Sequence, residues 1–212
     1  MKLHPQFPYA LYLVISQEAC LGKDMIQVAL QAIRGGVDII QLREKKASEK
    51  LFLQRAQQLT ELTEKHDVPL IINDNPNVAS KVNAAGIHVG NRDSRPAVLR
   101  KKPYFKERII GYSIEYLSQL DNEQTATSDY LGISPVFRTD TKKDTVTEWG
   151  LEGIAKIRQL TTKPLIGIGN LHQENAGSVI RSGADCIAVV SAICGAEDPE
   201  KAAYELKNAI LR

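Results

Sequence analysis

A segment of five residues about two-thirds of the way along the chain contains two hydroxyl and two ammonium groups, a composition suited to binding a phosphate. The segment reads Thr139-Asp140-Thr141-Lys142-Lys143 and lies between a predicted strand and a predicted helix. Hydroxyls and backbone N–H groups donate hydrogen bonds to phosphate oxygens, lysine adds a positive charge, and the N-terminus of a following helix adds the positive end of its dipole. The same composition is also typical of a solvated surface loop. The interpretation therefore depends on what other strand ends carry.

The end of the second predicted strand supplies further cationic groups. It reads Gln41-Leu42-Arg43-Glu44-Lys45, and alternation along a strand places Gln41, Arg43 and Lys45 on one side. If that side faces a binding site, an amide, a guanidinium and an ammonium point toward an anion. A surface ladder of charged residues is the alternative interpretation of the same segment.

Two aspartates follow neighbouring predicted strands. Asp74 comes directly after Asn73 at the end of the third strand, and Asp93 lies in the loop after the fourth. Adjacent strands lie about 4.8 Å apart, so these two carboxylates can converge. Mg²⁺ typically takes one or two carboxylates and completes its shell with water and substrate phosphate oxygens. The pair predicts a magnesium site, whereas the alternative for Asp74 is a cap on the helix that begins at Pro76.

Three later strand ends carry small or hydroxyl side chains. Ser113 ends the fifth strand, Gly169 and Asn170 follow the seventh, and Ser191 follows the eighth. In a barrel of alternating strands and helices, the loops after strands seven and eight often bind phosphate with the help of a short extra helix, for which 191–194 has a suitable length. These strand ends predict a second phosphate site. No nucleophile is paired with a base, and His88 is expected in the core or the barrel interior.

Eight strand-and-helix units would position these groups. Short apolar runs alternate with amphipathic stretches along the chain. The predicted strands are 12–15, 37–42, 70–72, 86–89, 109–113, 130–134, 165–168 and 186–190. The predicted helices are 24–34, 48–66, 76–82, 96–101, 114–125, 151–160, 173–182 and 199–211. Ser48 is expected to cap the second helix.

The near-continuous apolar strands predict a parallel sheet that is covered on both faces. Eight such units in 212 residues, with no linker between them, favour the α/β class and a single (β/α)8 TIM barrel that forms one domain over residues 1–212. The active sites of such barrels lie at the C-terminal ends of the strands, where all the groups described above fall.

Composition excludes several classes of protein. The 43% of hydrophobic residues can form a large core, and 27 basic against 25 acidic residues leave a net charge of +2 with no basic stripe for nucleic acid. No apolar run is long enough for a signal peptide or a membrane span, so a cytoplasmic location without membrane attachment is expected. The 3 cysteines are expected to be reduced and to fill the core. The sequence leaves the oligomeric state open, a homo-oligomer included.

Several of these segments, in matching order from about residue 11 to residue 200, resemble the thiamine phosphate synthase family. The matching segments are 41–45, 72–74, 86–90, 111–113, 139–144, 149–153 and 190–193. The resemblance implies a transferase that couples hydroxymethylpyrimidine diphosphate to a thiazole phosphate, with release of pyrophosphate and formation of thiamine phosphate. Its partners would be small phosphorylated substrates.

The resemblance also implies roles for individual residues. Asp74 and Asp93 would hold Mg²⁺, and Lys142, Arg43 and Ser113 would form the catalytic set. The residues implied for the pyrimidine diphosphate are Gln41, Arg43, Lys45, Asn73, Ser113 and Lys142, with Leu42 and Glu44 included in the substrate-binding segment. The residues implied for the thiazole phosphate are Thr139, Asp140, Thr141, Gly169, Asn170, Val190 and Ser191.

The sequence departs from the family pattern at the turn after the seventh strand. Asn170 stands where the family usually has a second glycine, and Asn91 replaces a usual glutamine before Asp93. Asparagine tolerates the left-handed backbone region better than most residues, so the turn can survive. Asn170 keeps open the alternative of a catalytically silent phosphate-ligand-binding barrel. A thiazole tautomerase is the other alternative, against which Asp74, Asp93 and Lys142 speak, as does Pro135, where tautomerases tend to carry histidine.

Overall fold

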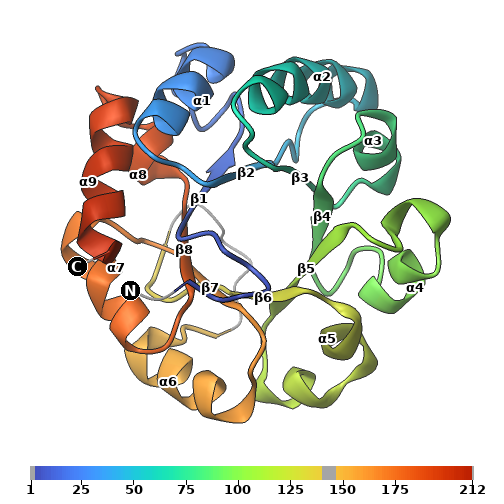
Figure 1. Cartoon of the computed structure of the whole chain (residues 1–212), viewed down its shortest axis with the longest axis vertical. Coiled ribbons are helices and arrows are strands. Elements are labelled where there is room, and N and C mark those ends of the chain that lie inside the picture. The colour runs from blue at the N-terminus through green and yellow to red at the C-terminus, as the bar shows by residue number, and fades with distance from the viewer. Residues whose placement is uncertain (1–2, 140–146, 212) are drawn as a thin grey trace.

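Eight parallel strands close into a barrel in the order in which they occur in the chain (Figure 1). The structure is a computed structural model and describes residues 3–139 and 147–211. The strands are β1 (Leu11–Ile15), β2 (Ile39–Leu42), β3 (Leu70–Asn73), β4 (Gly86–Val89), β5 (Ile109–Ile114), β6 (Tyr130–Ile133), β7 (Leu165–Ile168) and β8 (Cys186–Val189). β8 pairs with β1, with Leu11 opposite Ile187. The predicted (β/α)8 barrel is confirmed, whereas its extent as one domain over 1–212 stays a prediction.

Helices form a ring around this barrel (Figure 1). They are α1 (Met25–Arg34), α2 (Glu49–Lys65), α3 (Pro76–Lys81), α4 (Pro96–Arg100), α5 (Glu123–Thr127), α6 (Gly150–Leu160), α7 (Gln173–Arg181), α8 (Ser191–Cys194) and α9 (Pro199–Leu211), with 3₁₀ turns η1 (Pro103–Phe105) and η2 (Leu117–Asp121). Ser48 caps α2 as predicted, since its side chain accepts from Leu51 N. Among the described residues, no helix has the length and apolar character needed to cross a membrane.

The single helix predicted over 114–125 is wrong. β5 continues through Ile114, and the chain then forms η2 and α5 as two separate short pieces. Side chains divide the segment: Gln119 Oε1 accepts from Tyr116 N at 2.8 Å, and Asn122 Oδ1 accepts from Thr125 N at 2.8 Å. Amide side chains that bond to nearby backbone compete with a continuous helix in this way.

The strands separate two apolar cores. Residues on one side of each strand, such as Leu13 and Ile72, pack against the helices, while Tyr12, Ile71 and Tyr130 fill the barrel interior. The three cysteines are buried, as predicted. Four-residue strands that are buried on both faces explain the near-continuous apolar runs in the sequence.

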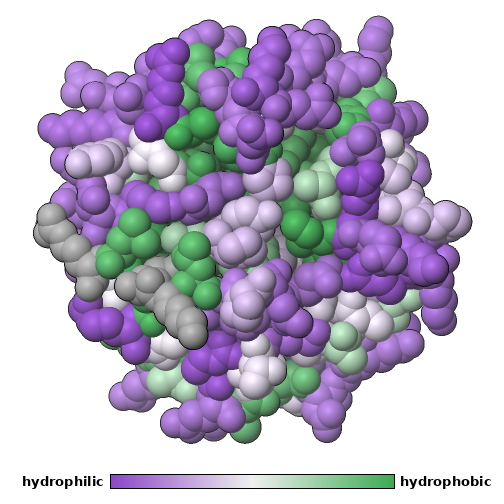
Figure 2. Space-filling model, viewed as in Figure 1, coloured by the Kyte–Doolittle hydropathy of each residue, from purple (hydrophilic) through white to green (hydrophobic). Residues whose placement is uncertain are grey.

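The segment before β1 crosses the N-terminal end of the barrel (Figure 1). Its Phe7 is 1% exposed and lies 4.8 Å from Tyr130, measured between ring centroids. Figure 2 looks onto the same face and shows hydrophilic side chains around most of its rim. Phe7 thus plugs this end, and the cavity described below lies toward the other.

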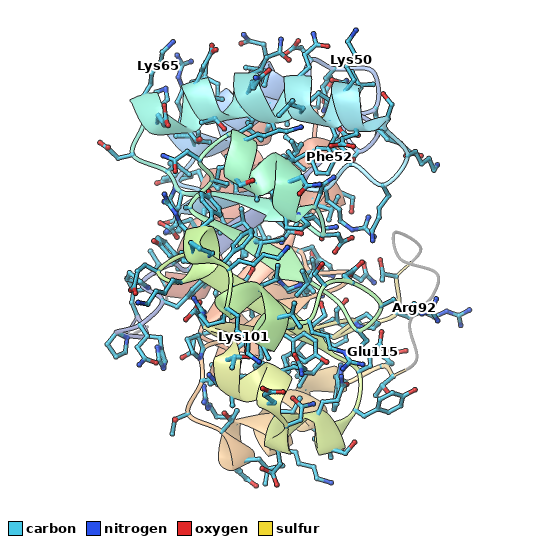
Figure 3. All side chains as sticks on the ribbon, turned by 90° about the vertical axis from the view of Figure 1, so that its right-hand side faces the viewer. Lys50, Phe52, Lys65, Arg92, Lys101 and Glu115 are labelled. Atoms are coloured by element: carbon cyan, nitrogen blue, oxygen red, sulfur yellow. The ribbon has the colours of Figure 1, made fainter. Side chains whose placement is uncertain are left out.

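The opposite end of the barrel gathers the loops that follow the strands. In Figure 3, Lys50 at the start of α2 lies at the same end as Arg92 and Glu115, which follow β4 and β5, while Lys65 lies at the other end. The segments that carry the candidate site residues therefore share one end of the molecule.

Candidate active site

Most of the predicted site residues that the structure describes surround one cavity at the C-terminal ends of the strands. Those that line it are Gln41, Arg43, Lys45, Asn73, Asp74, Asp93, Ser113, Thr139, Gly169, Asn170, Val190 and Ser191. Three others in the predicted set, Asp140, Thr141 and Lys142, lie outside the described residues. The cavity brings together side chains from at least six strand ends, as a barrel active site requires.

Asp74 occupies a strained position at the edge of this cavity. Its φ of 61° lies in the left-handed region, which residues other than glycine enter at a cost. Lys45 Nζ donates to Asp74 Oδ2, and Asn73 Nδ2 donates to the same oxygen at 2.6 Å. Asn75, not Asp74, caps α3, because Asn75 Oδ1 accepts from Val78 N at 3.0 Å. The alternative interpretation of Asp74 as a helix cap is therefore wrong.

Asp93 lies beside Asp74, as the adjacency of β3 and β4 predicts. Its Oδ2 accepts from Gly90 N at 2.9 Å. Burial raises the pKa of Asp93, and so does the neighbouring carboxyl group of Asp74. Two carboxyl groups held this close favour either a shared proton or a bound cation.

The donor set fits a hard divalent cation. Within the described part of the chain there is no cluster of three or more His, Cys, Asp or Glu residues that could enclose a metal. Two carboxylates at an open cavity match a cation that takes its remaining ligands from water and substrate oxygens, as Mg²⁺ does. A closed structural metal site would need more protein ligands.

Two residues of the second-strand segment do not reach the cavity. Leu42 is 0% exposed and packs in the core between barrel and helices. Glu44 Oε1 accepts from Gln17 N at 2.9 Å, and Glu44 Oε2 forms an ion pair with Arg55 at 2.9 Å. Strand alternation explains both positions, because these residues point away from Gln41, Arg43 and Lys45. Glu44 ties the loop after β1 to α2, and direct substrate contact by either side chain is not supported.

A cluster of three polar side chains holds the loop that carries Asp93. Asn91 Oδ1 accepts hydrogen bonds from both Tyr112 OH and Gln119 Nε2. Gln119 Nε2 also donates to Tyr112 OH at 2.9 Å. We call these residues, Asn91, Tyr112 and Gln119, the Asn91 clamp. It fixes the loop after β4 against β5 and η2.

The far side of the cavity has the features of a phosphate seat. α8 follows β8 as the predicted short extra helix, and Val190 and Ser191 at its start line the cavity. Asn170 has a φ of 50°, so it adopts the left-handed conformation that asparagine tolerates. A Cβ on Gly169 would lie 2.6 Å from Pro135 Cβ, so this position requires glycine. The turn after β7 is thus formed despite the departure at residue 170.

Three polar residues that the pattern of strand ends did not predict as site residues also line the cavity. Tyr12 OH lies 3.0 Å from Tyr130 OH, Tyr130 OH lies 2.9 Å from His88 Nδ1, and His88 Nε2 lies 2.8 Å from Ser113 Oγ. The prediction that His88 lies in the interior is confirmed. Burial raises the pKa of both tyrosines. They therefore act as neutral hydrogen-bonding groups, and their place among apolar strand residues was the sequence signal that could have identified them.

Comparisons with known proteins agree on one family. A family model described as thiamine monophosphate synthase matches residues 11–193. A thiamine-phosphate synthase from Albidiferax ferrireducens is 42% identical over 200 residues, which is 94% of this chain and 91% of that protein. One from Syntrophomonas wolfei is 41% identical over 201 residues, with 94% and 95% covered.

Solved structures show the same likeness. A thiamine phosphate pyrophosphorylase from Pyrococcus furiosus superposes with a TM-score of 0.86 at 32% identity and covers 96% of both chains. A 3-hexulose-6-phosphate synthase has a TM-score of 0.70 at 18% identity, with 95% of this chain and 99% of that chain covered. The second likeness is one of barrel fold alone.

Proposed function

Because the chain belongs to the thiamine monophosphate synthase family, we propose that it couples 4-amino-2-methyl-5-hydroxymethylpyrimidine diphosphate to a thiazole phosphate, releases pyrophosphate and forms thiamine phosphate. It is a transferase of thiamine biosynthesis that acts on small phosphorylated substrates. The observation that carries the proposal for its site is the gathering of Arg43, Lys45, Asp74 and Asp93 around one cavity. A cytoplasmic location stays a prediction, and the oligomeric state stays open.

Asp74 and Asp93 are the residues that would hold Mg²⁺. When bound, Mg²⁺ would supply positive charge against the oxygens of the departing pyrophosphate. Lys45 also lies at this position, because its ammonium group forms an ion pair with Asp74. The flexible stem of Lys45 would let its ammonium group also contact the diphosphate, because lysine carries a mobile point charge.

Arg43 and Lys142 would stabilise the remaining negative charge on the leaving pyrophosphate. The planar guanidinium of Arg43 can donate two parallel hydrogen bonds to phosphate oxygens. The assignment of Lys142 rests on the sequence, since the residue lies outside the described part of the chain. Asn73, Gln41 and Ser113 supply polar contacts to the pyrimidine diphosphate. These groups stabilise charge that develops as the carbon–oxygen bond breaks.

Formation of the new carbon–nitrogen bond depends on the positioning of the two substrates rather than on a protein nucleophile. Pyrophosphate leaves with the electron pair of the carbon–oxygen bond, and the ring nitrogen of the thiazole then forms the new bond to the methylene carbon of the pyrimidine. The thiazole phosphate would lie against Thr139, the turn at Gly169 and Asn170, and Val190 and Ser191, with Asp140 and Thr141 assigned from the sequence alone. Holding both reactants in one cavity converts a bimolecular encounter into a local one.

The first test is the release of pyrophosphate with both substrates, with each substrate alone, and with and without Mg²⁺. The expected result is release only when both substrates and Mg²⁺ are present. A thiazole tautomerase would convert thiazole isomers without the diphosphate, and a silent binding barrel would release nothing. Either outcome would contradict the proposal.

The Asn91 clamp is expected to affect Mg²⁺ affinity although none of its three residues is a proposed metal ligand. Tyr112→Phe removes one of the two donors to Asn91 while keeping the ring. We expect the Mg²⁺ concentration for half-maximal turnover to rise about tenfold, because groups that orient metal ligands typically contribute that much to metal affinity. Direct Mn²⁺ binding, followed by electron paramagnetic resonance, should weaken in parallel.

Tyr204→Phe is the matched control, because Tyr204 is 62% exposed on α9. It should leave the Mg²⁺ dependence unchanged. An unaltered Mg²⁺ and Mn²⁺ dependence in Tyr112→Phe would show that the clamp does not position Asp93.

A further inference from the structure

Five polar side chains from five strands form an unbroken line of hydrogen bonds across the barrel interior. Gln41 Nε2 donates to Tyr12 OH at 3.0 Å, and the line continues through Tyr130 and His88 to Ser113 Oγ at distances of 3.0, 2.9 and 2.8 Å. We call this set, Gln41, Tyr12, Tyr130, His88 and Ser113, the polar relay. All five residues line the candidate active-site cavity.

The relay has a direction because the atom of Gln41 in its first bond, Nε2, can only donate. An amide nitrogen has no acceptor capacity, so the oxygen of Tyr12 accepts from Gln41 and its proton is directed to Tyr130. The proton of Tyr130 is then directed to His88 Nδ1. A neutral imidazole that accepts at Nδ1 carries its proton at Nε2.

The last step sets the role of Ser113. If His88 Nε2 donates to Ser113 Oγ, the serine oxygen is an acceptor in that bond and its own proton is directed elsewhere. Among the described residues, no second hydrogen-bond partner of Ser113 Oγ is present, and the side chain lines the cavity. The hydroxyl proton therefore faces the space where a substrate binds.

The packing around the relay holds its side chains in fixed positions. The rings of His88 and Tyr130 are stacked, with centroids 5.5 Å apart and an interplanar angle of 21°. Gly111 lies beside this pair, and a Cβ at that position would overlap the Tyr130 ring and approach His88 Nδ1. Tyr12 and Tyr130 are each 1% exposed, so water has little access to exchange the bonds. Buried polar networks of this kind are rigid when every member is satisfied.

We propose that the polar relay fixes His88 as the Nε2–H tautomer and thereby makes Ser113 a hydrogen-bond donor to an acceptor atom of the pyrimidine diphosphate. The tautomer follows from the described geometry alone, whereas the ligand rests on the proposed function. Tyr130 and His88 are positioning residues, because they act on the substrate through Ser113.

The tautomer can be measured directly. In protein labelled with ¹⁵N-histidine, long-range ¹H–¹⁵N correlation spectra distinguish the protonated ring nitrogen from the other, and His88→Asn identifies the signal among the 4 histidines. We expect Nε2–H in the unaltered chain and a mixture with Nδ1–H in Tyr130→Phe, which removes the donor to Nδ1. A proton on Nδ1 in the unaltered chain, or an unchanged tautomer in Tyr130→Phe, would overturn the proposal.

Tyr104→Phe is the matched control for the spectra. Tyr104 OH donates to Ala79 O at 3.0 Å and to Ala84 O at 2.7 Å, outside the relay. Its loss should reduce stability without changing the His88 tautomer. A tautomer change in this variant would show that general loosening, rather than the relay, moves the proton, and would count against the proposal.

Kinetics test the second half of the inference. Tyr130→Phe should lower the single-turnover rate about tenfold in the unaltered background and have no effect in a Ser113→Ala background, because its action passes through that serine. Equal losses in both backgrounds would overturn the positioning role. If the chain released no pyrophosphate under any condition, the proposed function would fail, while the tautomer result would still decide the direction of the relay.

Discussion

Asp74→Asn is expected to reduce Mg²⁺-dependent pyrophosphate release about a thousandfold, because it removes one of the two carboxylates proposed to hold the cation. The substitution keeps the shape of the side chain. Asparagine also tolerates the left-handed backbone that Asp74 adopts at a φ of 61°, so the fold should be retained. The measurement is the steady-state rate with both substrates at saturating Mg²⁺, together with the unfolding midpoint in urea.

Asp67→Asn is a close control for this change. Asp67 is exposed and also left-handed, with a φ of 54°, but it follows α2 at the opposite end of the barrel. It should alter neither the rate nor the Mg²⁺ dependence. A rate for Asp74→Asn within a few-fold of the unaltered chain would remove Asp74 from the proposed cation site.

Lys142→Ala should also reduce turnover about a thousandfold, because it removes a cationic group that is proposed to stabilise the leaving pyrophosphate. The expectation rests on the composition of the 139–143 segment and on the family resemblance. Lys143→Ala is the matched control, because it removes the same charge one residue further along. We expect Lys143→Ala to retain most activity, measured as pyrophosphate release. Equal losses in the two variants would indicate a general electrostatic contribution of the loop rather than a specific contact.

Most of the fold could be predicted because the barrel imposes a simple pattern on the sequence. Each strand is buried on both faces, so apolar runs such as 165–168 and 86–89 mark strands with the bounds that the structure has. The prediction of one helix over 114–125 was wrong because the structure of this segment depends on hydrogen bonds from the backbone to the side chains of Gln119 and Asn122. Composition alone does not show whether such bonds form.

Much of the candidate site could be predicted for a related reason. Parallel strands bring their C-terminal ends to one edge, which explains why Asp74 and Asp93 meet and why Arg43 faces the same cavity. Alternation also explains why Leu42 and Glu44 point elsewhere. The polar relay could not be predicted in the same way, since it joins Tyr12 to Tyr130 across 118 positions of sequence. Its bonds depend on distances inside the barrel that no local pattern encodes.

In the proposed mechanism, a divalent cation held by Asp74 and Asp93 offsets the charge of a departing diphosphate. Calorimetric titration of the chain with pyrophosphate, at increasing Mg²⁺, tests it without any turnover. We predict binding that requires Mg²⁺ in the unaltered chain and is lost in the double variant Asp74→Asn, Asp93→Asn. Pyrophosphate binding of equal strength in the double variant, or in the absence of Mg²⁺, would contradict a cation site at Asp74 and Asp93.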